Sequence, residues 1–315
     1  MAAARPAPRS ALPALLVLGV LWGVTFPVSR LGVATGADPF LLVALDFAVA
    51  AAVMAPYAAA RRSVWPGARS LAVSAGLGAL LIGGINLPLF WGERFATGGA
   101  ASVVYATSPM VSLGFASALG TGERVGRRGV LALGVGLGGV FVLALAAGGA
   151  AVRSPWGLAA FGLGAVCQGA GAVALGRLRP AGEGRWGETA QFLGGGAASL
   201  VVLAVAAPSL AVRWGPAVVG SVLYVGVASM AIGYAIFFDL IHRHGAVGAN
   251  QVTYLNPVVA LAVGVVAFGE PFAPEEAVGL GLILLAIALL HAPRNRARAL
   301  APAAPVVSPD RLSPS

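Results

Sequence analysis

The sequence predicts an all-α integral membrane protein, with ten transmembrane helices arranged as two inverted repeats of five helices each. Three observations support this fold class. Of the 315 residues, 58% are hydrophobic and only 10% are charged, whereas charged residues make up about a quarter of a soluble domain. Apolar blocks of membrane-spanning length recur along the chain. The second half of the chain also repeats a pattern found in the first half.

Ten apolar blocks, each close to the ~20 residues that a helix needs to cross the hydrocarbon core, are separated by Arg, Pro and Gly. The first block is interpreted as a retained helix, because it is longer than the apolar region of a signal peptide and lacks a clear cleavage site. The expected helices cover residues 12–33, 39–60, 68–91, 97–119, 128–148, 155–176, 189–208, 216–240, 246–268 and 274–292.

The arginines support this count. The chain contains no Lys, and only Arg30, Arg94, Arg153 and Arg213 fall in loops opposite the N-terminus, so the other 16 of the 20 arginines lie on its side. Because basic residues concentrate on the cytoplasmic side, this bias predicts a multi-pass protein of the cell membrane with both termini in the cytoplasm. Short arginine clusters between apolar blocks indicate contact with membrane lipid and argue against a nucleic-acid partner.

The blocks divide the chain into four segments. Residues 1–11 are expected to form a cytoplasmic N-terminal segment, and residues 12–148 the first five-helix repeat. Residues 155–292 are expected to form the second repeat. The remainder, residues 293–315, is rich in Pro, Ala and Arg, a composition that predicts a disordered cytoplasmic tail.

Residues 102–125 and 250–272 align as two copies of one helix and the turn that follows it. Pro109 falls on Pro257, and the Gly-Glu pair at 122–123 falls on the pair at 269–270. Because five helices per copy is an odd number, the second copy enters the membrane from the opposite side. Inverted repeats are typical of secondary transporters, whose substrate site lies near the midplane. Weaker upstream matches pair Asp46 with Gln191, Trp22 with Cys167 and Asn86 with Tyr234.

The doubled Pro…Gly-Glu element, "LLVLGVLWGVTFPVSR" in the first helix and "GYAIFFDLIHRHGAVGANQVTYLNP" in the second copy resemble the EamA-type exporters of the drug/metabolite transporter superfamily. The resemblance covers roughly residues 12–292. It implies two inverted five-helix bundles around a central cavity. It also implies a secondary active transporter that exports a small metabolite, amino acid or drug by alternating access, without a cofactor.

Polar residues on apolar helices mark the expected cavity wall. On a continuous α-helix, residues 250, 253, 254 and 257 share one stripe, and residues 102, 105 and 109 form its counterpart. Each proline removes the donor for the carbonyl four residues earlier, and irregular backbone at membrane depth is tolerated beside a wet cavity. Alternatively, the polar groups bond between helices. The cavity candidates are Asn250, Thr253, Tyr254, Asn256, Pro257, Ser102, Tyr105, Pro109, Trp22, Asn86, Gln168 and Tyr234.

Asp46 is the most informative charged residue. It lies about 10 Å inside the second expected helix, and an intramembrane carboxylate is a functional candidate by default. We therefore consider it a possible coupling carboxylate, with protons as the candidate ion; the alternative is a structural pair with Arg30. Family members often carry Arg at this position, so Asp46 departs from their pattern. Glu93 and Arg94 are expected to form a local ion pair.

Other classes of function find less support in the sequence. An intramembrane enzyme would need paired aspartates, a Ser/His couple or a zinc-binding helix, and the chain shows none of these patterns. A sensor would need a soluble domain, which the short loops do not provide. No catalytic residue and no metal site is predicted, and both a monomer and a homodimer are compatible with the sequence. The nearly neutral expected cavity favours a zwitterionic or amphipathic solute over a polyanion.

Overall fold

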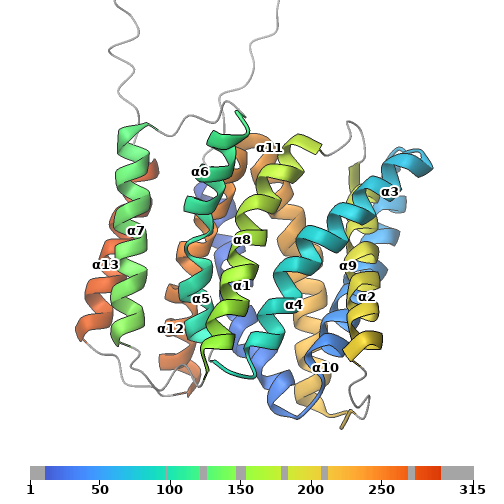
Figure 1. Ribbon diagram of the computed structural model, residues 1–315, viewed down its shortest axis with the longest axis horizontal. Helices are drawn as coiled ribbons and strands as arrows, with labels where there is room; N and C mark the ends of the chain where they lie inside the picture. The colour runs from blue at the N-terminus through green and yellow to red at the C-terminus, as the bar shows by residue number, and fades with distance from the viewer. Residues whose placement is uncertain are drawn as a thin grey trace, which may run out of the picture.

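The computed structural model describes residues 11–96, 98–120, 126–146, 154–178, 184–206, 212–268 and 274–291, and every regular element in these ranges is a helix (Figure 1). In the first half, the elements are α1 (Leu12–Ala34), α2 (Pro39–Ala60), α3 (Ala68–Leu77), η1 (Gly78–Ile82), α4 (Gly83–Gly92), α5 (Gly98–Tyr105), α6 (Ser108–Ala118) and α7 (Arg127–Ala146). In the second half, they are α8 (Pro155–Leu178), α9 (Gly184–Ala206), α10 (Pro216–Leu223), η3 (Tyr224–Tyr234), α11 (Ala235–Asn250), η4 (Gln251–Tyr254), α12 (Leu255–Phe268) and α13 (Pro274–His291).

The predicted all-α class is confirmed for these ranges. The N-terminal residues 1–10, the tail 293–315 and the two Gly-Glu pairs of the repeat lie outside the described residues.

Six helical stretches in the described residues are long and apolar enough to cross a membrane. Five of them span 22 to 25 residues; the sixth, Pro216–Val263, spans 48 residues. A straight helix of that length would measure about 70 Å, more than twice the ~30 Å hydrocarbon core. Gly245 interrupts it with φ 78° and ψ 170°, so the stretch consists of two helical segments, one on each side of Gly245. The six stretches are Leu12–Ala34, Pro39–Ala60, Ala68–Gly92, Pro155–Leu178, Gly184–Ala206 and Pro216–Val263.

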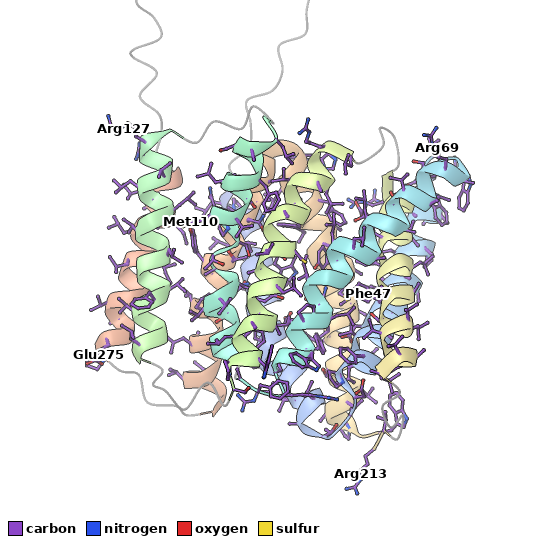
Figure 2. All side chains as sticks on the ribbon, viewed as in Figure 1. Phe47, Arg69, Met110, Arg127, Arg213 and Glu275 are labelled. Carbon is purple, nitrogen blue, oxygen red and sulfur yellow. The ribbon has the colours of Figure 1, made fainter. Side chains whose placement is uncertain are left out.

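The helices form one bundle with two distinguishable ends. Figure 1 shows α7 and α13 side by side at one edge and α2, α3 and α9 at the other, with α1, α4 and α8 between them. Arg69 and Arg127 lie at one end of the bundle, here called the Arg69 end (Figure 2). Arg213 and Glu275 lie at the opposite end, here called the Arg213 end.

Two π-helical segments occupy matching places in the two halves. η1 leads into Asn86, and η3 ends at Tyr234, the residue that the repeat alignment pairs with Asn86. A π-helix widens the turn, is rare, and is found frequently at functional sites. Its presence in both copies supports the internal repeat.

The two copies also make the same close helix contact. At the spacing that pairs Asn86 with Tyr234, Gly78 falls on Gly226. A Cβ atom on Gly78 would overlap the backbone of Gln191 in α9, and one on Gly226 would lie 3.0 Å from the backbone oxygen of Asp46 in α2. Since Asp46 and Gln191 are themselves matched, each copy contacts the other through equivalent residues.

The close approach of α3 to α9 yields a stability prediction. A Cβ atom on Gly194 would overlap the Ala75 backbone, so we expect Gly194→Ala to destabilise the protein by about 1–3 kcal/mol, the usual cost of overpacking. This sign is the opposite of the ordinary effect, because Ala favours a helix over Gly by roughly 0.5–1 kcal/mol. Thermal unfolding in detergent micelles measures the change.

Gly114→Ala is the matched control, because Gly114 is exposed on α6 and nothing lies within 4 Å of its Cβ position. We expect its Tm to equal or exceed that of the unmodified protein. A Gly194→Ala variant as stable as this control would contradict the close packing of α3 on α9.

Candidate functional site

A cavity lies between the two halves of the chain. The first half contributes residues of α1, α4 and α5, and the second half residues of α8, η3, η4 and α12. The cavity therefore sits where the copies meet. Its lining residues are Trp22, Thr25, Phe26, Ile85, Asn86, Leu89, Tyr105, Gln168, Ser229, Tyr234, Thr253 and Asn256.

The structure brings together part of the predicted set. Seven candidates contribute to the lining: Trp22, Asn86, Tyr105, Gln168, Tyr234, Thr253 and Asn256. The sequence analysis does not single out Ser229, Ile85 or Leu89. Ile85 and Leu89 are apolar residues in an apolar helix, and only their positions one before and three after Asn86 could have indicated them.

The other five candidates are buried outside this lining: Asn250, Tyr254, Pro257, Ser102 and Pro109. The expected stripes assume one continuous α-helix in each copy. Instead, α11 ends at Asn250 and a 3₁₀ segment, η4, separates it from α12. In the first copy a break at residues 106–107 separates α5 from α6. Because a 3₁₀-helix has three residues per turn rather than 3.6, residues on either side no longer share one face.

Tyr254 shows what one of these residues does instead. Its ring packs against Gly136 of α7, where an added Cβ would come within 3.1 Å of the ring. Its hydroxyl donates to the carbonyl oxygen of Leu133 at 3.0 Å. Tyr254 therefore joins η4 to α7 and faces away from the cavity.

The carbonyl group freed by Pro109 also finds a partner inside the protein. Ser108 donates its hydroxyl to the carbonyl oxygen of Tyr105 at 2.7 Å. The Tyr105 ring reaches the cavity, and its hydroxyl donates to the carbonyl oxygen of Ile85 at 2.7 Å. The expectation that this open carbonyl would line a wet cavity is thus corrected: a neighbouring hydroxyl supplies the missing donor.

A chain of hydrogen bonds connects the cavity wall to the helices behind it. Gln168 Nε2 donates to Asn250 Oδ1 at 3.1 Å, and Asn250 Nδ2 donates to Ser112 Oγ at 2.6 Å. Ser112 donates to the carbonyl oxygen of Gly169 at 3.1 Å. Because that carbonyl can only accept, it fixes the direction of every bond in the chain. Asn250 therefore acts as a link between helices, as the alternative interpretation expects.

Asn86 and Tyr234, the residues paired by the repeat alignment, contact each other in the cavity wall. Asn86 Nδ2 donates to the carbonyl oxygen of Ile82 at 3.0 Å and to the Tyr234 hydroxyl at 3.3 Å. Both amide hydrogens of Asn86 are thereby used. Its Oδ1 is the atom left to accept a hydrogen bond from a bound solute.

Aromatic rings form a second part of the wall. The Trp22 ring lies 5.3 Å from Tyr234 and 4.9 Å from Phe237, measured between ring centroids. Trp22 also donates Nε1–H to the carbonyl oxygen of Ser229 at 3.1 Å, which fixes the indole. Among the described residues that line the cavity, none is Asp, Glu, Lys, Arg or His. The cavity thus combines aromatic faces with neutral hydrogen-bonding groups.

Asp46 does not line this cavity. It is buried in α2, and neither of its carboxyl oxygens has a hydrogen-bond partner among the described residues. Arg30, considered as its structural partner, is exposed. The alternative of an Asp46–Arg30 pair therefore finds no support in the described contacts.

The expected Glu93–Arg94 pair is also corrected. Arg94 instead contacts Asp38 at 2.7 Å, and Asp38 caps α2 by accepting from the backbone N–H of Phe40 at 2.9 Å. Glu93 accepts from the Ser29 hydroxyl at 2.7 Å. Within the described ranges, no group of three or more His, Cys, Asp or Glu residues is placed to hold a metal ion.

Comparison with known proteins agrees with this arrangement. A family model described as the EamA-like transporter family matches residues 9–145 and again residues 155–292. The two matches together cover most of the chain.

Individual relatives are similar over nearly their whole length. The "Uncharacterized inner membrane transporter YedA" of Escherichia coli is 27% identical over 307 residues, covering 96% of each chain. The "Uncharacterized transporter YvbV" of Bacillus subtilis is 25% identical, covering 94% of this chain and 96% of the relative. The "Probable terminal-alkyne amino-acid exporter" of Streptantibioticus cattleyicolor is 30% identical over 282 residues, covering 88% and 92%.

A solved structure shares the fold. The match, titled "Crystal structure of protein", has a TM-score of 0.72 at 23% identity and covers 89% of this chain and 96% of the matched chain.

The hydrogen-bond chain behind the cavity yields a stability prediction. We expect Asn250→Ala to destabilise the protein by about 1–2 kcal/mol, because it leaves the buried groups of Gln168 and Ser112 without their partner. Asn256→Ala is the matched control, since the Oδ1 of this buried side chain has no partner among the described residues. Thermal unfolding of both variants in one detergent measures the difference. A control that loses as much stability as Asn250→Ala would contradict the linking role of Asn250.

Proposed function

This chain belongs to the EamA-like transporter family, and we propose that it is a secondary active transporter. Family membership and the transporters and exporters among its relatives support a general transporter role in the membrane rather than an enzymatic one. The proposal goes further: the protein exports a small metabolite, amino acid or drug-like solute across the cytoplasmic membrane. The observation that carries it is the neutral, aromatic-walled cavity between the two halves, where transporters built from repeats bind their substrates.

We further propose ten membrane spans in two inverted repeats, residues 12–148 and 155–292. Six described stretches have the length and composition of spans. Division of the longest at Gly245 gives a seventh. The paired helices α5 and α6, together with α7 and α13, supply the remaining three. The matched π-helical segments and the equivalent contacts of Gly78 and Gly226 support this division.

The two halves would alternate access to the cavity by rocking against each other. Both halves contribute to the wall, so a change in their relative tilt opens the cavity to one end of the bundle or to the other. The Asn86–Tyr234 hydrogen bond joins matched residues of the two halves. Matched residues meet only near the axis that relates the copies, and such an axis is where rocking moves atoms least.

The cavity chemistry favours a small zwitterionic or amphipathic solute. Asn86 offers a fixed acceptor, and the side-chain amides of Gln168 and Asn256 offer acceptors and donors, while Trp22 and Tyr234 offer aromatic faces. A polyanion would find no basic side chain among the described lining residues. One relative is named an amino-acid exporter, and an amino acid combines the two kinds of group that this wall can serve. Asp46, buried outside the wall, is the candidate carboxylate for proton coupling.

We propose that both termini are cytoplasmic. Arg69 and Arg127 lie together at one end of the bundle and Arg213 at the other (Figure 2), the separation that the positive-inside rule requires of the expected topology. A green fluorescent protein fused after residue 291 is expected to fluoresce, because it matures only in the cytoplasm. A fusion that is dark while alkaline phosphatase at the same place is active would reverse the orientation.

Export itself is tested by comparing metabolites in the medium of cells that carry the intact protein, a double variant or an empty vector. The double variant Asn86→Ala/Tyr234→Phe removes the polar pair from the cavity wall. Loss of one or two hydrogen bonds to the solute is expected to lower export at low substrate about tenfold or more. Tyr57→Phe is the control, since it removes the hydroxyl of an exposed side chain that does not line the cavity.

We expect a compound enriched outside cells with the intact protein and with the control, but much less with the double variant. Equal enrichment with the double variant would keep the transporter and reject this cavity as its site. No enrichment despite normal membrane expression would contradict export of the cell's own metabolites, and uptake assays would then follow.

A further inference from the structure

A second group of buried polar side chains lies outside the cavity. Asp46, Glu93 and Ser221 are only 1%, 3% and 2% exposed. Within the described part of the chain, both carboxyl oxygens of Asp46, Oε2 of Glu93 and Oγ of Ser221 have no hydrogen-bond partner. Unpartnered buried polar atoms are uncommon in folded proteins, and each calls for a ligand, a water molecule or an ion.

Helix register places Asp46 and Glu93 at the same depth. Gly32 of α1 faces Leu42 of α2, since an added Cβ would lie 3.3 Å from the Leu42 side chain. α1 and α2 follow each other in the chain and run antiparallel. A step toward the middle of the bundle therefore leads from Gly32 back along α1 to Ser29, and from Leu42 forward along α2 to Asp46. Each step is about one helical turn, or roughly 4.5–6 Å. Ser29 donates to Glu93, which brings the second carboxyl group to this level.

The two carboxyl groups lie next to the cavity but not in it. Phe26 of α1 and Leu89 of α4 line the cavity. Ser29 is three residues after Phe26, and Glu93 is four residues after Leu89. Both steps lead toward the Arg213 end, because α4 continues away from Arg69 (Figure 2). The carboxyl pair therefore sits one helical turn from the cavity, on the side of the Arg213 end.

Among the described residues, no basic side chain forms an ion pair with Asp46 or Glu93. Asp46 lies on α2 and Glu93 directly follows α4, and these two helices pack against each other. At the same depth, the two negative charges repel each other. Arg30 acts on Glu93 electrostatically but is exposed, and the Arg94 guanidinium contacts Asp38.

The tyrosines on the neighbouring helices are neutral groups already engaged in hydrogen bonds. Tyr105 donates to the Ile85 carbonyl, Tyr224 donates to the Leu21 carbonyl, and Tyr234 accepts from Asn86.

The matched position in the other repeat has no charge. Gln191 is as deeply buried as Asp46, and its side-chain oxygen and nitrogen also have no hydrogen-bond partner among the residues described. Each lies seven residues inside its helix, α9 or α2. Asp46 therefore adds a negative charge to a site that is otherwise symmetric, and Glu93 adds a second charge on the same side only.

We propose that Asp46 and Glu93 together form a site for one monovalent cation, and that this site is separate from the substrate cavity. The cation is either a proton or Na⁺. Two adjacent carboxylates in a low-dielectric interior cannot both stay ionised without a positive charge between them. The cation supplies that charge, and the Ser29 hydroxyl holds Glu93 in position. A role of the pair in coupling rests on the transport function proposed above. The binding of a cation by the pair does not depend on that function.

Infrared difference spectroscopy of the purified protein tests the pair without any solute. The carbonyl stretch of protonated carboxyl groups is followed from about pH 5 to about pH 10, and the spectrum of the double variant Asp46→Asn/Glu93→Gln is subtracted to isolate the pair. In Asp46→Asn, we expect the Glu93 midpoint to fall by about one pH unit or more, because a repelling charge is gone. In Glu93→Gln, we expect one carboxyl band to be lost.

Gln191→Leu and Glu275→Gln are the controls: the first changes the matched neutral site, and the second removes an exposed carboxyl group. Neither is expected to move the Glu93 midpoint. Replacing choline with Na⁺ in the buffer distinguishes the two cations, since Na⁺ binding lowers the midpoint whereas a site for protons alone does not respond.

An unchanged Glu93 midpoint in Asp46→Asn would show independent groups and overturn the proposal. So would a pair that stays ionised over the whole range in both buffers. Export without coupled titration would leave the proposed function intact and reject only this inference.

Discussion

The structure depends on one constraint: inside the hydrocarbon layer, a polar group must find its partner within the protein. Each irregular place in the helices shows how this chain meets the constraint. The break before Pro109 is closed by the Ser108 hydroxyl on the Tyr105 carbonyl. Tyr254 carries its hydroxyl to the Leu133 carbonyl of α7, and Asn250 joins Gln168 to Ser112. The bundle can therefore interrupt its helices near the cavity without leaving those groups bare.

Polar atoms that have no hydrogen-bond partner among the described residues mark the candidate binding sites. Asn86 uses both amide hydrogens within the wall and keeps its Oδ1 for a solute, while aromatic rings cover the adjoining surface. One turn away, Asp46 and Glu93 retain oxygens that no described group satisfies. The solute site is neutral and shared by both repeats, whereas the carboxyl pair belongs to the first repeat alone. In this arrangement the solute and the cation bind at separate sites. One helical turn of α1 and one of α4 connect the two sites.

Much of this could be predicted from the sequence, because lipid forces a simple pattern on helices. The six described stretches of membrane-spanning length follow from the apolar blocks. The proline breaks and seven of the lining residues follow from the prolines and polar residues that stand out in those blocks. The direction in which each polar group points does not follow. Asn250 and Thr253 fit one stripe on a continuous helix, yet the 3₁₀ segment η4 begins after Asn250, and Asn250 bonds to Ser112 while Thr253 lines the cavity. The sequence predicts a pair of Glu93 with its neighbour Arg94, since no sequence pattern shows that Ser29 of α1 donates its hydroxyl to Glu93.

The central claim is that the cavity opens in turn to each end of the bundle. It is tested most directly in a Cys167→Ser background that carries Ser229→Cys in the cavity wall. A membrane-impermeant thiol reagent is added to either side of sealed vesicles. A separate variant, Arg213→Cys, reports on which side of the vesicle membrane the Arg213 end of the bundle lies. We predict that Ser229→Cys is labelled from both sides, whereas Arg213→Cys is labelled from one. Labelling of Ser229→Cys from a single side only, or from neither, would contradict alternating access through this cavity.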